Sequence, residues 1–158
     1  MANTASLCTS FLSDLLNGTH NFGTAPIRAA TTADTFKGAL YLASATYNAS
    51  TTAYSATGEV SGTNYTAGGV TVTNANAPAS TNTSSTAGTA YWTPSASLVY
   101  TNVTLSTAFD TVLIYNSTQS NKAVGVYTFG SQTITAGTFT LTMPSNTTST
   151  ALIRIATT

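Results

Sequence analysis

From residue 35 onward, apolar and polar residues alternate in short runs that are typical of β-strands. Residues 70–73 read Val-Thr-Val-Thr, and residues 138–142 read Thr-Phe-Thr-Leu-Thr. A period of two places the apolar side chains on one face of a strand and the threonines on the other. Threonine suits the second face because its branched side chain is already restricted in a strand and its hydroxyl binds water without a charge. Residues 36–42, Phe-Lys-Gly-Ala-Leu-Tyr-Leu, are a further candidate strand.

Two more apolar runs, residues 110–115 and 123–129, predict a hairpin. Residues 116–121 lie between them and read Asn-Ser-Thr-Gln-Ser-Asn, a composition that favours a turn. A last short strand is expected over residues 151–155, whereas the low-complexity residues 75–90 predict a long exposed loop. Many short alternating segments separated by Gly, Asn and Ser predict a mainly β fold, an antiparallel β-sandwich or a barrel-like domain.

Only the N-terminal region has an apolar pattern with helical spacing. With Ser6 as a cap and Asn17-Gly18 as an end, the pattern predicts one short helix over residues 6–17. A helix of this length is marginal in water, so its apolar face must pack against its own domain or dock on another subunit. We therefore expect an N-terminal arm with an irregular segment over residues 1–34 and a single β domain over residues 35–158. The candidate partner-docking residues of the arm are Leu7, Phe11, Leu12, Leu15 and Leu16.

Charged residues are scarce, which narrows the possible partners. The 158 residues include four Lys or Arg and four Asp or Glu, for a formal net charge of zero. Nucleic-acid binding needs clustered basic residues, and none are present in this sequence. No run approaches the roughly 18 apolar residues of a membrane span. We expect neither a nucleic acid nor a membrane as partner.

The same scarcity argues against an enzyme. His20 is the single histidine, which excludes a site built from several histidines, and no Gly-x-Ser-x-Gly motif accompanies it. The acids Asp34, Glu59 and Asp110 are isolated in the sequence and could form a catalytic pair only through the fold. Cys8 has no partner for a disulfide and is expected to be a buried small hydrophobe rather than a reactive thiol. We expect no catalytic residues, no cofactor and no metal.

Aromatic residues allow two interpretations. Tyr47, Tyr54 and Tyr65 could line a carbohydrate-binding surface carried by loops. The alternative is that the aromatic residues, Trp92 among them, fill the core of a β domain, where they bury a large apolar area.

Several blocks of the sequence share one resemblance. The central block is residues 54–69, Tyr-Ser-Ala-Thr-Gly-Glu-Val-Ser-Gly-Thr-Asn-Tyr-Thr-Ala-Gly-Gly. Through it the chain resembles a family of small virion structural proteins that are encoded by tailed bacteriophages, cyanophages included. The further blocks that carry the resemblance are residues 15–20, 34–41, 112–117, 121–124 and 151–156.

This resemblance implies a non-enzymatic capsid decoration or cement protein at the virion surface. Such a protein clamps neighbouring subunits of the major capsid protein, often as a homotrimer. A neutral, Thr-rich domain suits this role because it avoids burying unpaired charges between subunits. Two other functions stay open: a tail- or fibre-associated phage module that binds the host, and a bacterial surface domain outside any virion.

Overall fold

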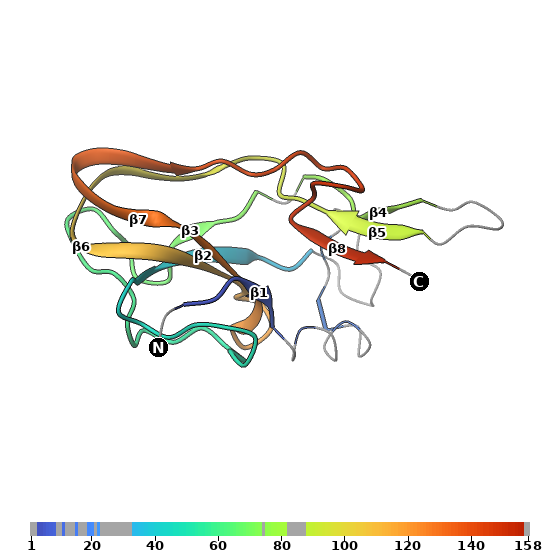
Figure 1. The fold of residues 1–158 in the computed structure, drawn as a ribbon, viewed down its shortest axis with the longest axis horizontal. Helices are drawn as coiled ribbons and strands as arrows, with labels where there is room; N and C mark the ends of the chain where they lie inside the picture. The colour runs from blue at the N-terminus through green and yellow to red at the C-terminus, as the bar shows by residue number, and fades with distance from the viewer. Residues whose placement is uncertain are drawn as a thin grey trace.

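The computed structural model describes residues 3–8, 11, 15, 19–20, 22, 33–73, 75–81 and 88–156. Its strands form two antiparallel sheets (Figure 1), which confirms the mainly β fold predicted from the alternating pattern. In chain order the strands are β1 (Ser6–Leu7), β2 (Phe36–Leu42), β3 (Val70–Thr71), β4 (Ala79–Ser80), β5 (Thr89–Trp92), β6 (Leu98–Asn116), β7 (Lys122–Leu141) and β8 (Ile153–Ala156).

A hairpin of two very long strands, β6 and β7, organises the larger sheet, whose strand order is β1-β7-β6-β2-β3. Both strands curve around one end of the molecule, so that the start of β6 and the end of β7 double back over the rest of the sheet (Figure 1). Tyr100 of β6 joins the two layers, because its Oη donates a hydrogen bond to the carbonyl oxygen of Gly38 at 2.8 Å. Gly38 has no side chain, which leaves room for the side chain of Leu98, at the start of β6.

The bend in the hairpin coincides with irregular strand pairing. The register between β6 and β7 shifts repeatedly between Tyr100 and Thr111, and such bulges bend a strand. Inside the bend, the ring of Phe109 meets the rings of Phe129 and Phe139 edge-on, with centroids 6.0 Å and 5.1 Å apart. These aromatic contacts hold the two arms of β7 together.

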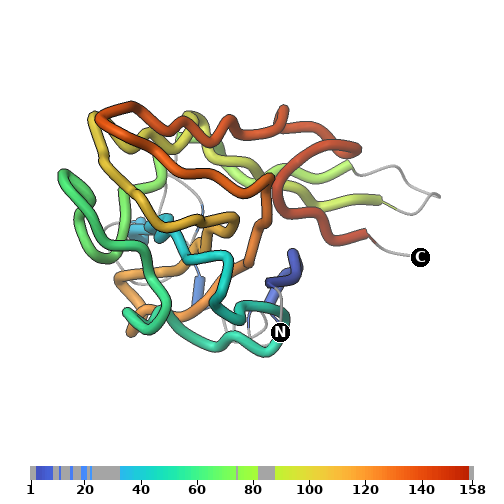
Figure 2. The backbone as a smooth tube through the Cα atoms, turned by 60° about the vertical axis from the view of Figure 1, so that its left-hand side comes forward, coloured from blue at the N-terminus to red at the C-terminus, as the bar shows by residue number. Residues whose placement is uncertain are grey.

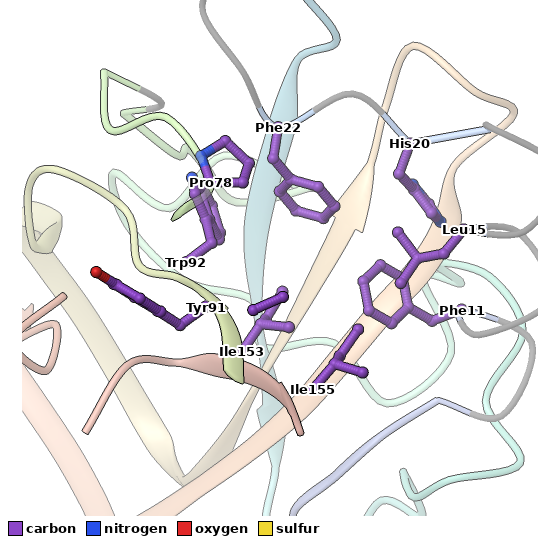
Figure 3. Close-up of a pocket in the computed structure, with 10 residues that line it drawn as sticks. Phe11, Leu15, His20, Phe22, Pro78, Tyr91, Trp92, Ile153 and Ile155 are labelled. Atoms are coloured by element: carbon purple, nitrogen blue, oxygen red, sulfur yellow. The ribbon is translucent and has the colours of Figure 1, made fainter. Parts of the chain in front are cut away.

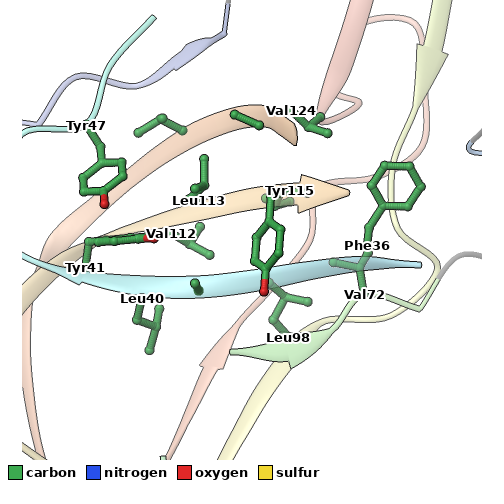
Figure 4. Close-up of a cluster of buried hydrophobic side chains, with 14 of the residues drawn as sticks. Phe36, Leu40, Tyr41, Tyr47, Val72, Leu98, Val112, Leu113, Tyr115 and Val124 are labelled. Atoms are coloured by element: carbon green, nitrogen blue, oxygen red, sulfur yellow. The ribbon is translucent and has the colours of Figure 1, made fainter. Parts of the chain in front are cut away.

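The core continues through both faces of the central strands (Figure 4). In the second half of β6, residues 111–116 are all buried, a pattern that requires cover on both sides of a sheet. One face packs under the doubled-back arms of the hairpin. The loop after β2 covers the other face, where the ring of Tyr47 lies 3.8 Å from the ring of Tyr41.

The smaller sheet has the order β4-β5-β8 and projects to one side of the body (Figures 1 and 2). Its strands are short: β4 has 2 residues and β5 and β8 have 4 each. The C-terminal strand thereby pairs with β5 and is an edge of the sheet.

Several predicted elements are confirmed, with changed boundaries. The strand over residues 36–42 is β2, and the turn between the two hairpin strands spans residues 117–121. The predicted strands over 123–129 and 138–142 belong to one continuous strand, β7. The exposed loop expected over residues 75–90 contains β4 and the start of β5, which pair with each other; residues 82–87 lie outside the described residues.

The helix predicted over residues 6–17 is wrong at its start. Ser6 and Leu7 form β1, which pairs with β7, and the backbone N–H of Cys8 donates to the carbonyl oxygen of Val124 at 3.2 Å. The edge of β7 therefore gives the N–H of Cys8 a partner, whereas in the first turn of the predicted helix this N–H would have had none within the helix. Phe11 and Leu15 have helical backbone conformations, whereas residues 9–10, 12–14 and 16–18 lie outside the described residues.

Candidate functional site

An apolar pocket of about 240 Å³ lies between residues of the N-terminal segment and the smaller sheet (Figure 3). We refer to it as the apolar pocket. Nearly all of the side chains around it are aliphatic or aromatic, so it offers hydrophobic contact and very few hydrogen bonds. The residues that line it are Phe11, Leu15, His20, Phe22, Pro78, Ala90, Tyr91, Trp92, Ile153 and Ile155.

Strands β5 and β8 form one wall of the apolar pocket. Their register places Trp92 opposite Ile153, and two residues along it places Ala90 opposite Ile155. Alternate residues share one face of a sheet, so these four side chains point to the same side. The indole of Trp92 is fixed because its Nε1 donates to the carbonyl oxygen of Asn76 at 2.9 Å. Ile155 is 41% exposed, so this wall is open to solvent at one end.

An aromatic cluster forms the opposite wall. The ring of Phe22 stacks on Phe36 of β2 with centroids 4.4 Å apart, and it lies 4.7 Å from the ring of Trp92. Phe11 meets Phe22 edge-on at 5.8 Å and contacts the His20 ring at 5.1 Å. Offset and edge-on contacts of this kind stabilise aromatic pairs beyond their buried area. The cluster thus connects the N-terminal segment, the body and the smaller sheet.

The predicted docking residues lie at this wall or beside it. Phe11 is 1% exposed, and Leu15 is partly buried; both line the apolar pocket. Leu7 lies in β1 and packs against the core of its own domain. Leu12 and Leu16 lie outside the described residues. In this structure the described part of the predicted arm therefore packs on its own chain, one of the two arrangements that the sequence left open.

A buried polar cluster lies behind the His20 side of the apolar pocket. The amide nitrogen Nδ2 of Asn116 lies 3.1 Å from His20 Nδ1 and donates to Asp34 Oδ2 at 2.8 Å. The amide oxygen of Asn116 accepts hydrogen bonds from the backbone N–H groups of Thr118 and Gln119. These two bonds fix the orientation of the amide, so Nδ2 faces the ring and Nδ1 of His20 is the acceptor.

This polar cluster connects the single histidine to an acid through an amide. Neighbouring hydroxyl groups bind the backbone: Ser117 Oγ donates to the carbonyl oxygen of Thr35, and Thr118 Oγ1 accepts from the N–H of Thr35. The cluster thereby fastens the hairpin turn to the residues that precede β2. Sequence reasoning missed Asn116, whose position just before a turn was the available signal.

Glu59 is the centre of a second polar cluster. Its Oε1 accepts hydrogen bonds from Tyr65 Oη at 2.8 Å and from the backbone N–H of Gly68 at 2.7 Å. Its Oε2 accepts from Tyr54 Oη at 2.7 Å. Burial and the hydrogen bond to this carboxylate raise the pKa of Tyr54 above its usual value. The cluster, which we call the Glu59 clasp, closes the loop between β2 and β3 on itself.

The three tyrosines considered for carbohydrate binding make hydrogen bonds within this loop. Tyr54 and Tyr65 bind Glu59, and Tyr47 is buried with its Oη donating to the carbonyl oxygen of Thr57 at 2.9 Å. The ring of Tyr54 also stacks on Tyr115 of β6, with centroids 4.8 Å apart. The three hydroxyl groups therefore bind the loop to itself, and the ring of Tyr54 packs the loop against the body.

The remaining reactive groups are also engaged or buried. Asp110 Oδ1 accepts from Asn3 Nδ2 at 2.9 Å and from Thr111 Oγ1 at 2.7 Å. Cys8 is buried, and burial raises the pKa of its thiol to about 11, so it is protonated at neutral pH. The described residues contain no group of three metal-ligating side chains, and none of their helical residues belongs to a segment long and apolar enough to cross a membrane.

Comparisons with known proteins give no further assignment. No protein-family model, no curated protein and no solved structure matches the chain.

Proposed function

We propose that this chain is a non-enzymatic structural protein of a phage particle, a decoration or cement protein that binds neighbouring subunits of the major capsid protein. The observation that carries the proposal is the apolar pocket, which has almost no polar lining and includes Phe11 and Leu15 from the predicted docking set. Such a pocket favours an apolar side chain of a protein partner, because burial of apolar surface contributes about 25 cal/mol per Å².

The polar side chains support a structural role in a different way. Glu59, Asp34 and Asp110 each accept hydrogen bonds that hold one segment of the chain to another. Catalytic acids and bases need a proton-transfer partner in a cleft, and these carboxylates are instead used to close loops. The sequence resemblance to small virion structural proteins agrees with a function that depends on surfaces rather than on chemistry.

The first experiment measures how many copies of the protein a purified particle contains. Quantitative mass spectrometry of the particles gives the ratio of this chain to the major capsid protein. We expect a ratio close to that of a shell component. A ratio typical of a few tail positions would replace this proposal with the tail- or fibre-associated role, and absence from the particles would reject both.

A second experiment tests the apolar pocket directly, using a matched pair of exposed residues. Ile155 lines the pocket and is 41% exposed, whereas Val99 is 45% exposed and lies outside it. We expect Ile155→Asp to abolish binding to capsids that lack the protein, while Val99→Asp binds like the wild type. Circular dichroism and thermal unfolding confirm that both variants are folded. Equal binding by the two variants would remove the pocket from the proposed interface.

A further inference from the structure

The outer side of β7 is a long sheet edge. β6 pairs with one side of this strand, and on the other side β1 pairs with Gly125 and Val126 only. Beyond residue 126, no strand of the described residues lies next to this edge. In Figure 2 the orange-red trace of the second half of β7 runs along the upper margin of the molecule.

Residues 139–141, at the end of this edge, lack the features that protect exposed strands, because they pair with β6 in regular register and the bulges of the hairpin lie outside them. Proteins usually shield such an edge with charged side chains, with proline or by keeping the strand short. β7 has 20 residues, and residues 123–141 contain no charged residue and no proline. The backbone groups of the edge can therefore pair with another strand, with no side-chain charge to oppose it.

The end of β7 has a regular side-chain pattern, which defines how a partner strand would align. Thr138 and Thr140 are exposed, whereas Phe139 and Leu141 are partly buried and pack against the core. Thr142 continues the alternation. An antiparallel strand must keep apolar residues opposite apolar ones, because a slip by one residue would reverse the two faces.

Two copies of residues 138–142, Thr-Phe-Thr-Leu-Thr, can pair antiparallel with apolar residues opposite apolar ones. In an antiparallel pair of two copies centred on Thr140, Phe139 of each copy lies opposite Leu141 of the other. Thr138 lies opposite Thr142, and the two Thr140 residues face each other at the two-fold axis. Cross-strand pairs of an aromatic with an aliphatic residue, and of Thr with Thr, are favourable.

We propose that this edge binds a second copy of the chain, with the ends of the two β7 strands paired antiparallel around Thr140. In each copy, the start of β6 and the end of β7 form one layer, and the pairing joins these layers of the two copies into one continuous sheet. The interface has two-fold symmetry, so the assembly is complete with two copies and does not grow into a fibre. The formal net charge of zero means that two copies have no overall charge repulsion to overcome.

Light scattering coupled to gel filtration tests the pairing on purified protein, independently of any particle. The chain has a mass of 16.1 kDa, and we expect the wild type to elute with twice that mass. Thr140→Lys puts two like charges face to face at the axis and should weaken the dimer by about fivefold or more. The matched control is Thr101→Lys, an exposed threonine of β6 that is one strand away from the edge.

A charge-complementation experiment completes the test. Mixing Thr140→Lys with Thr140→Glu should restore dimers that contain one copy of each variant, because the opposed charges then attract. Circular dichroism checks that all variants are folded. A wild type that stays monomeric at high concentration, or a trimer of the kind the sequence resemblance implies, would overturn the two-fold pairing. So would a dimer that Thr140→Lys leaves intact.

Discussion

The body of this protein, which is the larger sheet with its bent hairpin and the loop between β2 and β3, differs from the smaller sheet in how much of its side-chain surface is buried or hydrogen-bonded. In the body, residues 111–116 are buried without a break. The Glu59 carboxylate of the adjoining loop accepts hydrogen bonds from Tyr54 and Tyr65, and Tyr115 of β6 donates to the backbone of this loop. The smaller sheet has strands of 2 to 4 residues and leaves one face open at the apolar pocket. The body therefore holds most of the buried contacts, and the open face of the smaller sheet is the surface that our proposal assigns to a partner.

We expect the largest loss of stability when the aromatic contact inside the hairpin bend is removed. Phe109 is fully buried between Phe129 and Phe139, so Phe109→Ala should lower the free energy of unfolding by about 3–5 kcal/mol. Ile155→Ala, in the open wall of the pocket, should change it by no more than about 0.5 kcal/mol. Urea denaturation measures both. Similar losses in the two variants would contradict the division between a stable body and an open sheet.

A glycine in the body gives the next largest effect. Gly69 has φ of +74°, and a Cβ there would lie 1.7 Å from the carbonyl oxygen of Gly38. Gly69→Ala therefore forces two backbone segments apart and should cost about 3 kcal/mol. Gly130→Ala is the control, because its Cβ would meet only the end of the Gln132 side chain, at 4.0 Å. If Gly69→Ala unfolds at the same urea concentration as the control, the close approach of the two segments is not required.

The Glu59 clasp should contribute less. Glu59→Gln keeps the shape of the side chain but replaces charge-assisted hydrogen bonds with neutral ones, so we expect a loss of about 1–2 kcal/mol. Tyr54→Phe removes one of the three donors and should cost about 1 kcal/mol or less. Limited proteolysis of the loop between β2 and β3 gives a local measurement. Unchanged cleavage of this loop in Glu59→Gln would show that the clasp does not hold it.

The last expected effect is confined to alkaline pH. Burial raises the pKa of Cys8 from 9.0 to about 11, so the folded state holds a proton that the unfolded state loses first. This contribution to stability is complete below pH 9 and declines as the pH rises toward 11. We expect thermal unfolding temperatures to fall over this range by less in Cys8→Ala than in the wild type. An identical decline would assign the whole effect to the buried tyrosines, whose pKa values are also raised.

The sequence predicts short elements, whose residue types determine them locally, better than it predicts the full lengths of long strands. Strand β2 and the turn at residues 117–121 were predicted because their residue types determine them locally. The full lengths of β6 and β7 were missed, since bulges interrupt their alternation. Asn102 and Ala136 have left-handed φ angles of 52° and 46°. A strand that continues through such a residue loses its regular alternation there, so the sequence pattern stops before the strand does.

The N-terminal segment shows why short apolar patterns are ambiguous. Leu7 and Phe11 fit one face of a helix, yet Leu7 extends along β7, because an available sheet edge outweighs the weak preference of a short helix. The apolar pocket could not be predicted at all. Its described walls combine residues from the N-terminal segment, such as Phe11 and Phe22, with residues of β5 and β8, such as Trp92 and Ile153, and only the fold brings these segments together.

The bent hairpin also has a kinetic consequence. Because one hairpin supplies strands to both layers, much of the larger sheet can form by zipping outward from the turn at residues 117–121 before any distant segment arrives. Docking of β2, whose residue Phe36 pairs with Asn116 from 80 positions away, closes a long loop and should follow more slowly. Substitutions near the turn should therefore slow refolding, whereas substitutions in the smaller sheet should mainly speed unfolding.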